Sequence, residues 1–168
     1  MSVEAPERQL EWEARAGRLA AVAAFVGGLL PFVGAVVFRA SLGEVGAGTV
    51  DFLTAVDGAP GGVLAGAALG AIGTLAVPVA LAYLHRATRA RRPESAGFVL
   101  PLLAVAAVGV AAVLAVEQIA LLDVAGQVAE LEEPTEEEAD GLVEDSSLSQ
   151  IATVSFVFRV AFGASLLM

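Results

Sequence analysis

The most regular feature of the sequence is a set of four long stretches that carry almost no charge. They have 20, 27, 22 and 23 residues, with one arginine in the last: Leu19–Phe38, Gly58–Leu84, Ser95–Val116 and Ser146–Met168. An α-helix rises about 1.5 Å per residue, so about 20 apolar residues cross the ~30 Å hydrocarbon core of a bilayer. The pattern therefore predicts four transmembrane helices, at about 19–39, 59–84, 96–122 and 147–168.

The composition also favours lipid as the surroundings of most of the chain. Of the 168 residues, 57% are hydrophobic and 17% are charged, whereas soluble domains are about half apolar and a quarter charged. In lipid, an α-helix satisfies its own backbone hydrogen bonds. We therefore expect an all-α fold, a polytopic membrane protein with a four-transmembrane-helix bundle. The last stretch reaches Met168 without a closing arginine, so the chain could also be a fragment of a larger helical membrane protein.

Arginines are distributed unequally between the two ends of the predicted helices. Three precede the first helix and four lie between the second and third: Arg8, Arg15, Arg18, Arg86, Arg89, Arg91 and Arg92. The opposite end has Arg39 alone. Because short loops rich in arginine stay in the cytoplasm, residues 1–18 are predicted to form a cytoplasmic amphipathic leader. The 40–57 and 123–145 connections then face outward.

The second arginine group also predicts a contact with lipid. Anionic headgroups attract such clusters, so we expect a headgroup anchor made of four residues: Arg86, Arg89, Arg91 and Arg92. All nine basic residues of the chain are arginine, and Ala, Val and Gly fill the helices. This bias is typical of GC-rich prokaryotic genomes. The expected location is a prokaryotic plasma membrane, crossed several times, with the N-terminus in the cytoplasm.

The formal net charge of −10 comes from one connection. Residues 123–145 hold ten acids and no base. Such a segment repels itself and contains no aromatic residue, so the sequence predicts a solvated, mobile extracytoplasmic loop. Capture of a cation is the competing interpretation, but the spacing of a calcium-binding loop is absent from the sequence.

The second predicted helix has a repeat of glycine at every fourth position. Its members are Gly58, Gly62, Gly66 and Gly70. Small residues at this spacing let two membrane helices approach closely. The partner is either another helix of this chain or a second protein, and we favour the first.

Two charged residues interrupt the apolar stretches. Arg159 lies near the middle of the fourth predicted helix, where an unpaired charge costs ~3 kcal/mol. Glu117, with Gln118 beside it, interrupts the third, and an extended arginine can reach it. Arg39 could join them in an intramembrane charge network. A structural ion pair and a substrate-coupled site both explain these residues, and we favour the first.

No motif in the sequence assigns a chemical activity. The chain has no cysteine and one histidine, and it lacks the zinc-protease, serine-hydrolase and phosphate-loop motifs. We therefore expect a protein that is not an enzyme and needs no cofactor, metal or nucleic acid. The favoured function is a structural or assembly bundle whose partners are the lipid bilayer and a homo-oligomer or membrane-protein partner at the glycine ridge. The alternative is a transporter or channel-like module that uses Glu117 and Arg159.

Overall fold

The computed structural model describes residues 4–91 and 98–167, and these ranges consist of six helices joined by short connections. In chain order the helices are α1 (Glu4–Ser41), α2 (Thr49–Asp57), α3 (Pro60–Arg91), α4 (Val99–Ala129), α5 (Glu136–Asp145) and α6 (Ser147–Leu167). No β-strand occurs within the described ranges. The predicted all-α class is confirmed.

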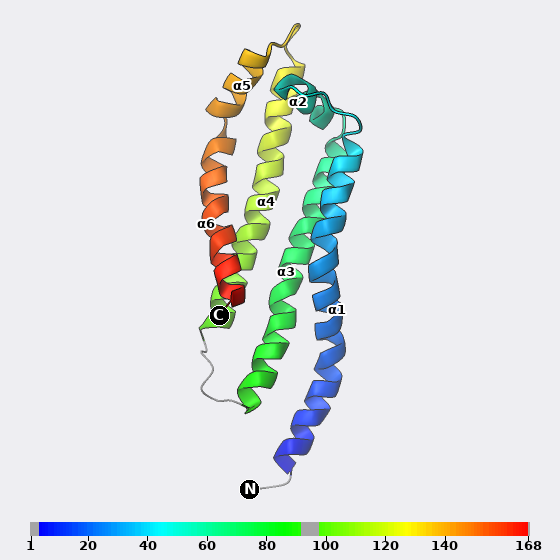
Figure 1. Ribbon diagram of the computed structural model, residues 1–168, viewed down its shortest axis with the longest axis vertical. Helices are drawn as coiled ribbons and strands as arrows, with labels where there is room; N and C mark the ends of the chain where they lie inside the picture. Colours follow the sequence, from blue (N-terminus) through cyan, green and yellow to red (C-terminus); the bar gives the residue numbers. More distant parts are fainter. Residues whose placement is uncertain (1–3, 92–97, 168) are drawn as a thin grey trace.

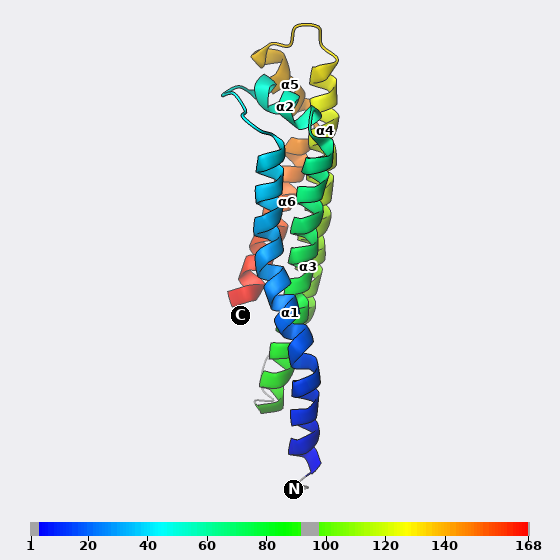
Figure 2. The same ribbon diagram turned by 90° about the vertical axis from the view of Figure 1, so that its right-hand side faces the viewer.

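The four long helices stand side by side in the order α1, α3, α4, α6, each antiparallel to the next (Figure 1). Figure 2 views the row from its α1 side. Along the row, α3 lies between α1 and α4, and α4 lies between α3 and α6. Within the described residues, α1 does not approach α4 or α6. The bundle is therefore open between its first and last helices.

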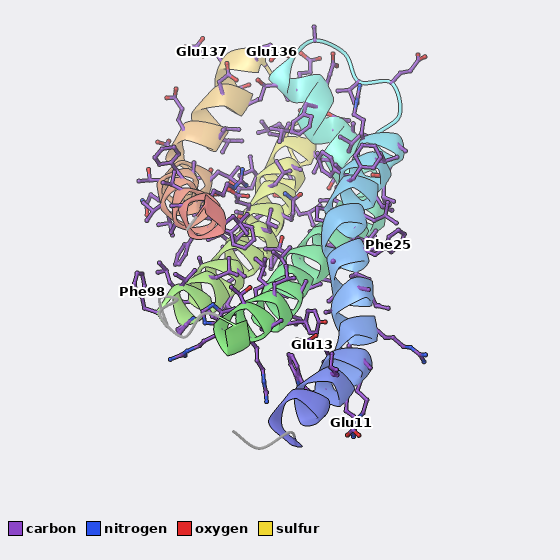
Figure 3. The ribbon with its side chains drawn as sticks, turned by 60° about the horizontal axis from the view of Figure 1, so that its bottom comes forward. Glu11, Glu13, Phe25, Phe98, Glu136 and Glu137 are labelled. Carbon is purple, nitrogen blue, oxygen red and sulfur yellow. The ribbon has the colours of Figure 1, made fainter. Side chains whose placement is uncertain are left out.

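Three helices are long and apolar enough to cross a membrane: Leu10–Ser41, Pro60–Arg89 and Val99–Ala129. A fourth crossing results if α5 and α6, which are bent by 59° relative to each other, form one broken span. Large apolar side chains cover the outer surfaces, and Figure 3 shows Phe25 pointing away from the other helices. Lipid accommodates such surfaces, whereas water does not. The chain is thus a membrane-embedded helical protein with three to four candidate spans.

The predicted leader is continuous with the first span. Residues 10–18 belong to the same unbroken helix as the apolar stretch that follows. An exposed pair between Arg15 Nη2 and Glu11 Oε2, at 3.4 Å, joins neighbouring turns in this segment, as expected for opposite charges four residues apart. Met1 to Val3 lie outside the described residues.

Glycines allow α1 and α3 to pack closely. A Cβ atom added to Gly66 would lie 2.8 Å from the carbonyl oxygen of Gly34, and one added to Gly62 would collide with Ser41. Gly70 contributes its backbone nitrogen, 3.1 Å from where a Cβ of Gly34 would be. Gly62 and Gly66 therefore face α1 of the same chain, whereas a Cβ on Gly70 would point toward Leu114 of α4. Gly58 does not belong to the ridge, because it caps the C-terminus of α2 before α3 begins.

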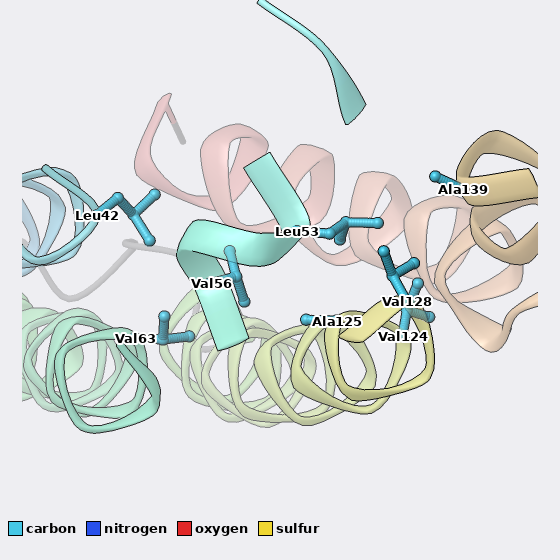
Figure 4. Packing of buried hydrophobic residues seen from close by; sticks show 8 residues of the cluster. All are labelled: Leu42, Leu53, Val56, Val63, Val124, Ala125, Val128 and Ala139. Atoms are coloured by element: carbon cyan, nitrogen blue, oxygen red, sulfur yellow. The ribbon is translucent and has the colours of Figure 1, made fainter. Parts of the chain in front are cut away.

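The end of the molecule that carries α2 and α5, the acidic end, has a packed apolar core (Figure 4). Leu53 and Val56 of α2 are buried between the ends of the long helices and α5. The other buried members are Leu42, Val63, Val124, Ala125, Val128 and Ala139. The prediction of a mobile loop over 123–145 was wrong, because α4 continues to Ala129 and Glu136–Asp145 form α5. A high density of like charge did not prevent helix formation, since α5 is capped and buries Ala139.

Candidate functional site

The candidate site is the ion pair between Glu117 of α4 and Arg159 of α6. The Arg159 Nη2 atom donates a hydrogen bond of 3.0 Å to Glu117 Oε2. This is the charge pair that the sequence predicted, and it lies in the apolar part of both helices. Glu117 is about six residues, or ~9 Å, from Asp123 at the end of the apolar run, and Arg159 is about twelve residues, or ~18 Å, into α6.

Helix geometry explains why two residues at different depths meet. Side chains of an α-helix lean toward the N-terminus of their own helix. In the antiparallel pair α4 and α6, Arg159 therefore leans toward the acidic end, and Glu117 leans away from it. The ring of Phe158 packs on Gly109, which places Arg159 about two turns deeper than Glu117. The long side chain of Arg159 spans this difference in depth and brings its guanidinium to the Glu117 carboxylate.

The pair is unequally covered by protein. The side chain of Glu117 is 20% exposed, whereas that of Arg159 is 57% exposed. A guanidinium has five N–H donors, and the bond to Glu117 is the one hydrogen bond that it makes within the described part of the chain. Most of its donors therefore face the outside of the bundle, in the apolar part of α6.

Two further polar atoms are buried near this level. Ser155 is 4% exposed and lies one turn before Arg159 on α6. Neither Ser155 Oγ nor Gln118 Oε1 has a hydrogen-bond partner among the described residues. Leaving a buried polar atom without a hydrogen bond costs about 1–3 kcal/mol of folding free energy. In the sequence, Ser155 is marked by nothing except its spacing of four residues from Arg159.

The structure does not bring Arg39 to this pair. Arg39 lies on the exposed side of the last turn of α1, and α1 does not approach α4 or α6 in the described residues. Of the three residues predicted to form a charge network, only Glu117 and Arg159 meet in the described structure. The physical reason is the open bundle, because α3 separates the first helix from the site.

At the opposite end of the molecule, the arginine end, α1 and α3 are joined by aromatic contacts. The rings of Trp12 and Tyr83 are stacked with centroids 5.4 Å apart, and the guanidinium carbon of Arg86 lies 4.5 Å from the centre of the Trp12 ring. Arg86 is thus tied to Trp12 by a cation–π contact, while Arg89 is exposed. Arg92 and the side chain of Arg91 lie outside the described part of the structure.

At the acidic end, α5 caps α2. The Glu136 Oε2 atom accepts hydrogen bonds from the backbone N–H groups of Thr49, at 2.7 Å, and Val50, at 3.5 Å. The Thr49 hydroxyl donates to Asp140 Oδ1 at 2.6 Å. A carboxylate at a helix N-terminus is favourable because it accepts from otherwise unpaired N–H groups and opposes the helix dipole. A Cβ at Gly48 would collide with the Glu136 carboxylate as it stands in this contact, so a larger residue there would displace the capping side chain.

The N-terminus of α5 is itself closed by a capping box of Thr135 and Glu138. The Thr135 side chain and the Thr135 backbone N–H both hydrogen-bond Glu138 and lower the pKa of its carboxyl. The spacing Thr-x-x-Glu before a helix is a recognised start signal. It was present in the sequence and would have predicted α5.

Two of the hollows on the described part of the chain lie away from the ion pair. One, of about 550 Å³, is at the arginine end and is lined by Glu11, Trp12, Arg15, Ala16 and Leu19. The other, of about 160 Å³, lies where α4, α5 and α6 meet, and its polar lining includes Asp123, Gln127 and Asp145. Among the described residues, no three His, Asp or Glu side chains are grouped as ligands of a metal ion.

Comparison of the chain with protein-family models, with curated proteins and with solved structures found no match.

Proposed function

We propose that this chain is a non-enzymatic membrane protein that acts as a structural or assembly subunit. The observation that carries the proposal is the exposure of Arg159, whose side chain is 57% accessible although it lies in the apolar part of α6. A charge at that depth costs at least ~3 kcal/mol when it faces hydrocarbon. A protein partner that covers it removes this cost. We place the subunit in a prokaryotic plasma membrane, with the arginine end in the cytoplasm.

The face to be covered is defined by four residues of α6, which we call the Arg159 face. They are Ala152, Phe156, Arg159 and Gly163, spaced four, three and four residues apart, so they lie on one side of the helix. Phe156 is 69% exposed, and a Cβ at Gly163 would meet open space. Small residues flanking an aromatic and a charged side chain fit a neighbouring helix better than disordered lipid tails.

Site-specific photocrosslinking tests the assembly function. A benzoylphenylalanine introduced at Phe156 keeps the aromatic character and reacts with whatever lies beside it. We expect a covalent protein adduct after irradiation of membranes from cells that make the chain at low level. Phe32 is the matched control, because it is also 69% exposed but lies on α1, which does not contact α4 or α6 within the described residues. If Phe156 gives no more protein adduct than Phe32, the assembly function is wrong.

A transporter or channel-like module is the second candidate, and the same exposed ion pair supports it. In that case water would cover Arg159. A Phe156→Cys variant would then react with a charged, water-soluble thiol reagent, whereas a face covered by protein would not. The control is Phe32→Cys, and the natural chain contributes no background because it has no cysteine. Fast labelling at position 156 alone would favour transport over assembly.

A further inference from the structure

We propose that the Arg159 face docks on the same face of a second copy of this chain, so that two Glu117–Arg159 pairs join into one ring of four alternating charges. The inference rests on the proposed assembly function and names its partner. The chain already covers the other candidate surface, because the ridge glycines Gly62 and Gly66 pack on α1.

The unused hydrogen-bonding capacity of the pair is self-complementary. Arg159 uses one of its N–H donors within the described residues, and the carboxylate of Glu117 can accept more bonds than this one. A second copy supplies what each lacks: acceptors for the guanidinium and donors for the carboxylate. Further charge-assisted bonds of this kind are stronger than bonds between neutral groups.

Charge balance also favours a second copy over an unlike partner. Glu117 and Arg159 neutralise each other, so a partner with one extra acid or base would leave an unpaired charge in lipid. Two copies together bring two acids and two bases, and the sum is zero. Twofold association places equal surfaces against each other, which this arrangement requires.

The surroundings of the pair suit close contact between two such faces. Ala152 and Gly163 flank the charged residue one to two turns away, and both lack bulk that would keep two α6 helices apart. Phe156 protrudes between them, 69% exposed, and can pack beside its counterpart. Within the described residues, α4 and α5 are the helices that contact α6, so no other helix covers the Arg159 face.

Two copies with different affinity tags, made in the same cells, test the inference. One copy carries benzoylphenylalanine at Phe156, and we expect an adduct that contains both tags. Adducts with other proteins alone would overturn the second-copy inference but leave the assembly function standing. Absence of any protein adduct would overturn both.

Charge exchange between copies then tests the ring itself. A Glu117→Arg copy carries two bases and an Arg159→Glu copy carries two acids, so the mixed pair should be recovered about tenfold more than either variant with itself. The double variant in one chain keeps the charge balance, serves as the folding control and should self-associate like the natural protein. If each single variant pairs with itself as well as with the other, the ring does not exist.

Discussion

At the scale of the residue, the pairing of Glu117 with Arg159 follows from two directions that the backbone imposes. Antiparallel helices turn their side chains toward opposite ends of the bundle, so a deep arginine and a shallower glutamate converge across 3.0 Å. Arg39 has no such route, because α1 contacts α3 and not α4 or α6 in the described structure. The positions of the charges along the apolar stretches therefore predicted two residues that interact, Glu117 and Arg159, and one that does not, Arg39.

A double-mutant cycle measures the coupling free energy between the side chains of Glu117 and Arg159. Each of Glu117→Gln and Arg159→Gln leaves one charge unpaired in the apolar layer and should lower the stability by about 3 kcal/mol. The double variant should lose much less than the sum, since no unpaired charge remains. Unfolding in detergent gives the three values, with exposed Glu133→Gln as the control. Additive losses would show that the two side chains do not interact.

The two charges of the ion pair could be found in the sequence, whereas the buried Ser155 beside them could not. A charge inside an apolar run is visible by inspection, so both members of the pair were predicted. Ser155 was not predicted, because a serine is common in membrane helices. Its burial without a hydrogen-bond partner depends on the packing of α6 on α4. The exposure of Arg159 depends on what the open bundle leaves uncovered, and no local pattern encodes that.

At the scale of the element, the two short helices of the acidic end hold each other. Helix α2 has Gly48 as its N-cap, and this residue offers no side-chain acceptor; Glu136 of α5 supplies the acceptor instead. The apolar positions Leu53 and Val56 of α2 then close the core against α4. Charge density suggested a mobile loop over 123–145, whereas the Thr135–Glu138 capping signal marks the start of α5.

Removing the charge of Glu136 should loosen this end of the molecule. Glu136→Gln takes a full negative charge from the N-terminus of α2, and we expect the melting temperature in detergent to fall by about 3 °C. Glu137→Gln is the matched control, because it removes the same charge one residue away on α5. Equal melting temperatures for the two variants would mean that the capping contact contributes nothing to stability.

At the scale of the whole molecule, the hydrophobic pattern predicted the membrane class and the order of the long helices. It did not predict that the first and last helices are not in contact. Helix length and apolar character are local properties, so α1, α3 and α4 could be located from the chain alone. Which helices touch depends on close approach, such as the contact of Gly34 with Gly66. That contact holds α1 beside α3 and away from α6, which contacts α4 and α5 in the described structure.

Two exposed positions, one at each end of the molecule, test the predicted orientation. Thr135 forms the cap of α5, so Glu133 in the preceding connection is the better site for a cysteine at the acidic end. Thr88, exposed near the end of α3, marks the arginine end. Because arginine-rich ends are retained in the cytoplasm, a membrane-impermeant maleimide should label Glu133→Cys in intact cells and Thr88→Cys only after permeabilisation. The opposite labelling would invert the orientation, and it would place the ten acids of 123–145 in the cytoplasm.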